Sequence, residues 1–165
     1  MKVFGVTGWK NAGKTGLMER LVTEITGRGL RVSTIKHAHH NFDVDQPGRD
    51  SHRHRVAGAQ EVLISSGQRW ALMHELRGAE EPSLATLLGK LSDVDLVLVE
   101  GFKQDRHPKV EAWRAEAAHP FICHDDETIR AVASDTFRDD LPVPCLDLDD
   151  TSTIADLVLR EAVDV

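Results

Sequence analysis

Near its N-terminus the chain reads Gly8-Trp9-Lys10-Asn11-Ala12-Gly13-Lys14-Thr15, which matches the phosphate-binding pattern G-x-x-x-x-G-K-[ST]. The phosphates of a nucleotide are wrapped by backbone N–H groups, and this wrapping needs glycine where a side chain would collide, as at Gly8 and Gly13. We expect Lys14 to place its ammonium against the β- and γ-phosphates and Thr15 to offer its hydroxyl to Mg²⁺. The pattern therefore predicts a P-loop.

The residues on either side of the loop agree with this prediction. An apolar run over residues 3–6 precedes the loop and predicts a buried strand. Behind the loop, apolar residues recur at helical spacing until Gly27 and Gly29, namely Leu17, Met18, Leu21, Val22 and Ile25. Because the N-terminus of a helix attracts anions, this strand, loop and helix are expected to bind phosphate together.

Composition predicts one compact protein. A chain of 165 residues with 41% hydrophobic and 28% charged residues fits a single P-loop nucleotide-binding domain over residues 1–165. The formal charge of −7 argues against a nucleic-acid partner, although basic residues cluster between Lys36 and Arg55 and predict a small anion site.

Cysteine content and hydropathy indicate the compartment. The two cysteines, Cys123 and Cys145, lack C-x-x-C spacing, so we expect core thiols rather than a disulfide framework or a zinc site. No secretory apolar segment begins the chain, and no apolar run approaches the roughly 18 residues that span a bilayer. We expect a cytoplasmic protein without a membrane partner.

The order of patterns along the chain predicts the fold class. Further strands are expected at residues 31–36, 93–99, 130–134 and 143–148, and helices at 48–58, at 83–91 and after a cap at Thr151 or Ser152. Two alternating runs at 61–65 and 68–74 flank Ser66-Gly67 and predict a hairpin antiparallel to the main sheet. The expected fold is α/β and P-loop NTPase-like, with a mainly parallel sheet flanked by helices.

Two acidic residues follow predicted strands and are therefore candidate site residues. Glu100 ends the run Leu96-Val97-Leu98-Val99, at the edge where open α/β sheets place ligands, and is a candidate for orienting Mg²⁺. Asp135 follows the strand at 130–134 and is a candidate for reading the N1 and N2 donors of guanine. A loop or capping role for Asp135 stays open, because no N-K-x-D sequence specifies guanine.

Residues 37–55 form the most unusual part of the chain, with five of the nine histidines, three aspartates and three arginines. Arg49, Arg53 and Arg55 oppose a nearby cation and favour an anionic ligand, so a phosphate or substrate-anion site ranks ahead of a transition-metal site. A solvated polar loop is the third interpretation. Asp43, Asp45 and Asp50 are candidates for the outer coordination shell of Mg²⁺.

Three segments together carry a family resemblance: G-W-K-N-A-G-K-T at 8–15, the histidine-rich block from Lys36 to Ala59, and L-V-L-V-E-G-F-K at 96–103. In this combination the chain resembles the MobB family of molybdopterin-guanine dinucleotide biosynthesis adapter proteins. The resemblance covers about the first two thirds of the chain. It is specific, because the histidine-aspartate block does not belong to P-loop proteins generally.

The resemblance implies a homodimeric GTP-binding protein that assists the molybdenum cofactor guanylyltransferase, which joins GMP to molybdopterin. Its own GTPase activity would be weak, and molybdopterin is a further candidate partner. The residues that would hold the phosphates are Lys10, Asn11, Ala12, Gly13, Lys14 and Thr15. Thr15 and Glu100 would serve Mg²⁺, and Arg49 and Arg53 would face an anionic ligand.

Two other function classes stay open from the sequence. A small ATP-dependent kinase or ligase resembling dethiobiotin synthetase would also place a glutamate-glycine pair after a buried strand. A nucleotide-dependent metallochaperone resembling the nickel-insertion GTPases would use the histidine block, His39 and His40 in particular. Fast hydrolysis requires a residue that positions water and usually an arginine finger, and neither is evident, which favours a binding role.

Overall fold

The computed structural model describes residues 1–38 and 42–165 and divides into two compact units. The larger unit comprises Met1–His37 and Leu84–Val165, and the hairpin unit comprises Ala38–Ser83. The chain leaves the larger unit after one strand of its sheet and returns to it at a helix, so the hairpin unit is an insertion in the sequence of that fold.

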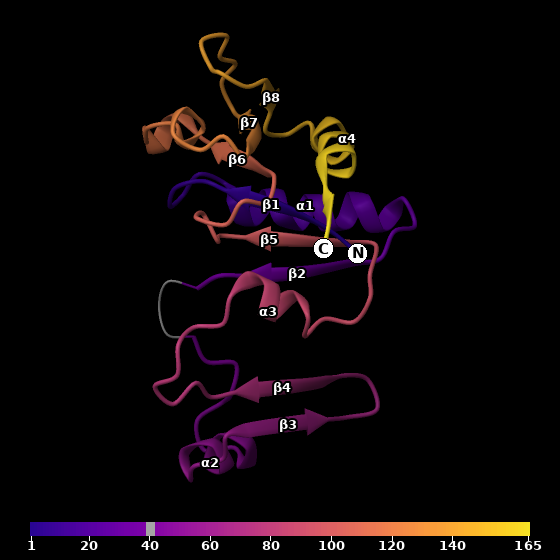
Figure 1. Ribbon diagram of the computed structural model, residues 1–165, viewed down its shortest axis with the longest axis vertical. Helices are drawn as coiled ribbons and strands as arrows, with labels where there is room; N and C mark the ends of the chain where they lie inside the picture. The colour runs from indigo at the N-terminus through magenta and orange to yellow at the C-terminus, as the bar shows by residue number, and fades with distance from the viewer. Residues whose placement is uncertain (39–41) are drawn as a thin grey trace. The chain divides into compact units, whose positions relative to one another are not determined.

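The larger unit is built on a seven-stranded sheet with the order β2-β5-β1-β6-β7-β8, in which β9 additionally pairs with β1 (Figure 1). The strands are β1 (Lys2–Thr7), β2 (Val32–Lys36), β5 (Leu96–Glu100), β6 (Lys109–Trp113), β7 (Ile129–Ser134), β8 (Cys145–Asp147) and β9 (Val163–Asp164). All neighbours are parallel except β9 and β1. This arrangement confirms the predicted mainly parallel α/β fold.

Helices cover the sheet because its strands are apolar on both faces. Helices α1 (Lys14–Gly27) and α4 (Thr151–Glu161) pack on the face that carries Phe4, Val6, Leu96 and Leu98. The short helix α3 (Leu84–Leu88) packs on the opposite face, against Val3, Val97 and Val99. Farther along, Trp113, Ile129 and Val132 form a third apolar cluster with Cys123 from the 3₁₀ turn η2 (Ile122–His124).

Strand β6 is displaced along the sheet, and this displacement matters for the site. Its first residue, Lys109, lies beside Gly5 in the middle of β1, so β6 extends past the end of β1. The edge of β1 that β6 leaves free, at Lys2 and Val3, pairs instead with β9. The carboxyl end of β6 therefore projects beside the loop that follows β1, before the turn η1 (Ala115–Ala117).

The hairpin unit contains α2 (Asp50–Val56), β3 (Glu61–Ser65) and β4 (Trp70–His74). The two strands pair antiparallel with each other over five residue pairs, from Glu61 with His74 to Ser65 with Trp70. The predicted hairpin is thus confirmed, and β3 and β4 form a two-stranded sheet of their own, separate from the seven-stranded sheet. The reason is that this insertion folds locally, with each strand pairing to its nearest neighbour in sequence.

Three further expectations concern the cap of α4, the two cysteines and the length of the helices. The carboxylate of Asp150, rather than Thr151 or Ser152, caps α4 by accepting a hydrogen bond from Thr153 N at 3.1 Å. Cys123 is buried as expected, whereas Cys145 is only half-buried, and both thiols are free. Within the ranges that the structure describes, the helices are too short or too polar to cross a bilayer.

Candidate functional site

The loop between β1 and α1 has the backbone shape that its glycines predict. Gly8 and Gly13 adopt φ values of 143° and 93°, and Asn11, at φ 64°, is also left-handed. A Cβ atom on Gly8 would lie 2.5 Å from the carbonyl oxygen of Ala112 on β6. Only glycine fits there, because the loop passes directly against the neighbouring strand.

The N-terminus of α1 is open to an anion. Gly13 occupies the N-cap position and supplies no side-chain hydrogen bond, and the first turn contains no acidic residue. The amide groups of this turn lack intrahelical acceptors, and the helix dipole adds positive potential. The backbone at the start of α1 therefore leaves amide donors available to an anion, and phosphate binding stays a prediction.

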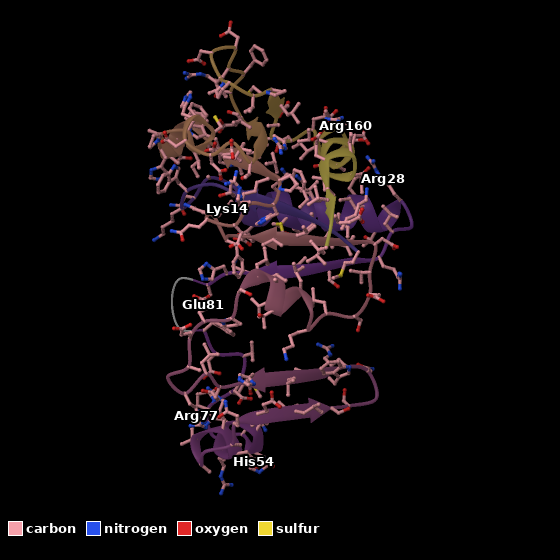
Figure 2. All side chains as sticks on the ribbon, viewed as in Figure 1. Lys14, Arg28, His54, Arg77, Glu81 and Arg160 are labelled. Carbon is pink, nitrogen blue, oxygen red and sulfur yellow. The ribbon has the colours of Figure 1, made fainter. Side chains whose placement is uncertain are left out.

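Lys14 stands at the first position of this helix (Figure 2). Its Nζ atom donates to the carbonyl oxygen of Trp9 at 2.6 Å, within the same loop. Burial lowers the pKa of Lys14, and the ammonium groups of Lys103 and Lys36 lower it further, whereas the carboxylate of Glu100 raises it. Lys14 thus interacts with one carboxylate and two further ammonium groups at the phosphate loop.

Glu100 is the last residue of β5 and is buried, with 9% of its surface exposed. Its carboxylate forms an ion pair with Lys36 Nζ at 3.2 Å, because the parallel register places Lys36 beside Glu100 at the ends of β2 and β5. Its partner on the other side is Val6, just before the loop. The structure thus brings Glu100 to the phosphate loop, as the sequence predicted. Thr15 lies exposed in the first turn of α1.

Trp9 connects the loop to residues on both sides. The indole Nε1 atom donates to the carbonyl oxygen of Pro120 at 2.7 Å, and the ring lies 5.7 Å from that of His119. The Lys103 ammonium sits 4.2 Å from the indole centroid. Trp9 therefore bridges the segment after β5 and the segment after β6.

Arg114 is a site residue that the sequence reading missed. It follows β6, and a Cβ atom on Gly13 would lie 2.9 Å from its Nε atom. The Nε atom is buried and has no hydrogen-bond partner within residues 1–38 and 42–165. The sequence patterns did not indicate a strand before Arg114, because Lys109-Val110-Glu111-Ala112-Trp113 does not resemble a buried strand.

Asp135 lies directly after β7, where the sequence placed it. Its side chain accepts a hydrogen bond from the Ala115 amide at 3.0 Å, which links it to the residue after Arg114. Asp135 is exposed. The carboxylate thus holds a neighbouring loop and still has one oxygen with acceptor capacity towards solvent.

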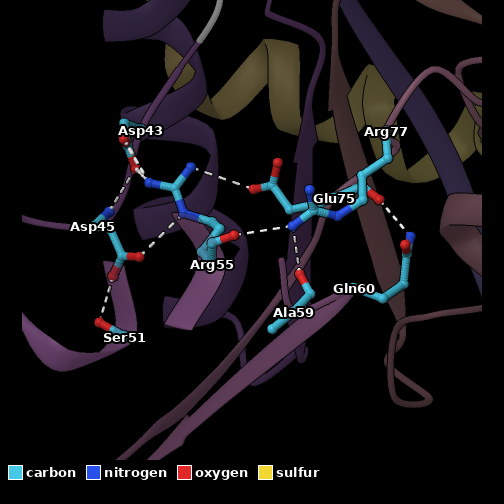
Figure 3. Close-up of polar contacts among 8 residues, drawn as sticks. All are labelled: Asp43, Asp45, Ser51, Arg55, Ala59, Gln60, Glu75 and Arg77. Carbon is cyan, nitrogen blue, oxygen red and sulfur yellow. Dashed lines mark hydrogen bonds and ion pairs between the residues drawn. The ribbon is translucent and has the colours of Figure 1, made fainter. Parts of the chain in front are cut away.

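The arginines of the histidine-rich block lie in the hairpin unit and differ in their contacts. Arg55 contacts three carboxylates of its own unit: Asp43 at 2.7 Å, Asp45 at 3.3 Å and Glu75 at 3.3 Å (Figure 3). Its guanidinium hydrogen bonds hold the pKa of Asp43 below the usual range. Arg55, Asp43 and Asp45 therefore form an internal network of the hairpin unit, and an anion site or magnesium shell at these residues stays a prediction.

Arg49 and Arg53 are both exposed, at the N-cap of α2 and within the helix. His39 and His40, on which the metallochaperone reading depends, lie outside the described residues. Among the residues that the structure does describe, no three His, Cys, Asp or Glu side chains group as a metal site.

Comparison with known proteins agrees with this geometry. Residues 3–135 match the family model of MobB, molybdopterin guanine dinucleotide synthesis protein B. The molybdopterin-guanine dinucleotide biosynthesis adapter protein of Escherichia coli (strain K12) is 42% identical over 155 residues, which are 92% of this chain and 88% of the relative. The protein of the same name from Haemophilus influenzae is 39% identical over 159 residues, covering 94% and 86% of the two chains.

A solved structure shares the fold. The crystal structure of a MobB protein homolog from Bacillus stearothermophilus superimposes with a TM-score of 0.71 at 29% identity and covers 96% of each chain.

Proposed function

This chain belongs to the MobB family of molybdopterin guanine dinucleotide synthesis proteins, and from that membership we propose that it is a GTP-binding adapter. In this proposal it assists the guanylyltransferase that attaches GMP to molybdopterin. The observation that carries the nucleotide part is the phosphate loop itself: left-handed glycines, an uncapped helix N-terminus and Lys14 beside a buried glutamate. The adapter part rests on the names of the relatives.

The donor set of the site fits a magnesium nucleotide. Mg²⁺ is commonly bound by one or two protein oxygens together with phosphate oxygens and water. We assign these protein oxygens to the Thr15 hydroxyl and the Glu100 carboxylate. When bound, the ion would neutralise charge on the phosphates, while Lys14, Lys10 and the amides from Asn11 to Thr15 hold them. Glu100 would then exchange its ion pair with Lys36 for the metal.

Guanine preference is proposed for the residue after β7. Asp135 presents a carboxylate at the same edge of the sheet as the phosphate loop, and a carboxylate is the natural acceptor for the N1 and N2 donors of guanine. Adenine has no such pair of donors. The assignment predicts that Asp135→Asn reduces GTP affinity more than ATP affinity.

A slow GTPase is the third part of the proposal. Rapid hydrolysis requires a group that orients the attacking water. The buried acid at this site, Glu100, is ion-paired with Lys36 instead. A turnover of several per second by the isolated protein would refute this part.

The hairpin unit supports a homodimer. Leu63, Trp70 and Leu72 occupy one face of the β3–β4 pair by register and are 61%, 65% and 46% exposed. Exposed apolar strands with open edges are avoided in monomers, so we propose that a second copy of this chain covers them. Sedimentation should show a dimer, and Leu63→Glu with Leu72→Glu should give a monomer that still binds GTP.

The two units are proposed to act as one nucleotide-binding protein, because the hairpin unit is inserted between β2 and α3 of the larger unit. Arg49 and Arg53 are proposed to contact an anionic partner or ligand, for which molybdopterin, with its phosphate, is a candidate.

The test of the proposed function is a calorimetric titration with GTP and with ATP in Mg²⁺, with Lys14→Ala as the binding-deficient control. We expect the wild-type protein to prefer GTP and Lys14→Ala to lose this binding. We also expect the wild-type protein, but not Lys14→Ala, to stimulate a molybdenum cofactor guanylyltransferase. An ATP preference with ADP release dependent on a small substrate would favour a kinase or ligase. Nickel or zinc retention that His39→Ala and His40→Ala abolish would favour a metallochaperone.

A further inference from the structure

The carboxyl end of β6 delivers an arginine to the phosphate loop. Thr7, the last residue of β1, pairs with Glu111, and β6 continues for two more residues before Arg114. The Nε and Cδ atoms of Arg114 lie 2.9 Å and 3.7 Å from the position that a Cβ atom on Gly13 would take. The guanidinium stem therefore packs on the residue that precedes Lys14.

Within residues 1–38 and 42–165, no acceptor explains the position of the Arg114 Nε atom. Its Nε atom is buried and unpartnered in the described part of the chain. Asp135, the nearby carboxylate after β7, accepts from the Ala115 amide. By contrast, Arg20 on α1 donates from Nε to Thr151 Oγ1 at 3.0 Å and from Nη2 to the Leu148 carbonyl at 2.6 Å. Buried cationic donors are normally satisfied, so a missing acceptor at a phosphate loop indicates a ligand.

From these contacts we propose that Arg114 binds an anionic phosphate oxygen of the nucleotide and supplies a cation in cis from the β6 side of the loop. The proposal rests on the proposed function, because it needs a nucleotide at the loop. On the β5 side, Lys14 interacts with Glu100, Lys36 and Lys103, and Lys36 forms an ion pair with Glu100. Because β5 and β6 flank β1, Arg114 completes a set of cations on both sides of the phosphates.

The chemistry suits a guanidinium better than an ammonium. A guanidinium has five donors in a planar fork, so Nε can face the loop while the terminal nitrogens reach a phosphate. Arginine also remains charged when partly buried. Arg114 is thus assigned a binding role, and no step of hydrolysis is assigned to it.

The test compares Arg114→Gln with the wild type by calorimetry, using GTP and inorganic tripolyphosphate as separate probes in Mg²⁺. We expect Arg114→Gln to weaken both ligands by about 10-fold to 100-fold, the range for one charge-assisted hydrogen bond. The matched control is Arg130→Gln on β7, an exposed arginine whose loss removes the same charge. It should bind within twofold of the wild type.

Three results would overturn the inference. Wild-type affinity of Arg114→Gln for both probes would do so, and so would a loss for GTP alone, which would place the contact at the base or ribose. If the wild-type protein binds neither probe, the proposed function fails as well. If Lys14→Ala loses binding and Arg114→Gln keeps it, only the Arg114 assignment is wrong. Thermal unfolding checks that the variant folds, and Arg114→Met, which keeps the packing on Gly13, is the second variant with the same expected loss.

Discussion

The Lys14 ammonium donates to the carbonyl oxygen of Trp9, five residues earlier in the same loop, at 2.6 Å. The ammonium therefore stabilises its own loop in the structure, and we expect it to exchange this contact for a phosphate oxygen when a nucleotide binds. Since the Trp9 indole also contacts Lys103 and donates to Pro120, the exchange changes the surroundings of the ring.

The first prediction is that GTP binding changes the fluorescence of Trp9. The measurement is a fluorescence titration in protein that carries Trp70→Phe, since Trp70 is exposed in the hairpin unit. Adding Lys14→Ala should abolish the response at the same GTP concentrations, because the exchange no longer occurs. Trp9→Phe tests whether the fluorescence change comes from Trp9. A change that persists in this variant would contradict the prediction.

Glu100 is predicted to make GTP binding dependent on Mg²⁺. In the wild type, Mg²⁺ should strengthen GTP binding by roughly tenfold, because in the proposed site the Glu100 carboxylate would help to hold an ion that neutralises charge on the phosphates. Glu100→Gln should reduce this gain to below twofold and leave metal-free binding intact. Calorimetry with and without EDTA measures both. Asp95→Asn, just before the other end of β5, should behave as the wild type; an equal Mg²⁺ gain in Glu100→Gln would exclude Glu100 as a metal ligand.

His107 is predicted to make the fold sensitive to acid. Its ring packs on Gly5 of β1, both ring nitrogens are buried without hydrogen-bond partners among the described residues, and burial lowers its pKa from 6.5 to about 4. Between these two pH values the unfolded chain binds a proton that the folded protein does not. The free energy of unfolding should therefore fall, by about 2 kcal/mol, as the pH falls from 6.5 to 4.

Urea unfolding at pH 7 and at pH 4.5 tests this expectation. His107→Leu should lose the part of the acid sensitivity that His107 contributes, because leucine has no proton to bind. His124→Gln, which removes an exposed histidine, should leave the sensitivity unchanged. The same drop in His107→Leu as in the wild type would assign the sensitivity to other groups.

Arg55 is predicted to hold the hairpin unit together. It contacts Asp43, Asp45 and Glu75, and the side chain of Asp45 is only 4% exposed. Arg55→Ala leaves these carboxylates facing one another without a cation, so the unit should open locally. Limited proteolysis should cut residues 42–75 roughly tenfold faster, while the larger unit stays protected. Arg69→Ala at the hairpin turn is the control, and unchanged cutting in Arg55→Ala would contradict the role.

Much of the fold follows from local patterns. The phosphate loop, α1, β2, β5, β7 and the hairpin all lie within a few residues of their predicted bounds, because apolar periodicity and glycine positions act locally. Strand β6 does not follow from such patterns. Its fully buried Lys109 and Glu111 look like surface residues in sequence, but Lys109 donates to Thr128 Oγ1 at 2.6 Å and Glu111 accepts from the amides of Ile122 and Cys123. Buried charges of this kind are recognisable only once their partners are placed.

The sequence by itself determined the phosphate loop, since left-handed backbone at Gly8 and Gly13 depends on the absence of a side chain, a property of single residues. It also determined the family, because the loop, the histidine block and the strand ending at Glu100 occur together. Only the tertiary structure decided which charges surround the loop. Lys36, Lys103 and Arg114 come from separate segments, and the parallel register of β2, β5, β1 and β6 sets which strand ends meet. Register depends on packing across the whole sheet, so the positions of the cations around the loop are fixed by long-range contacts.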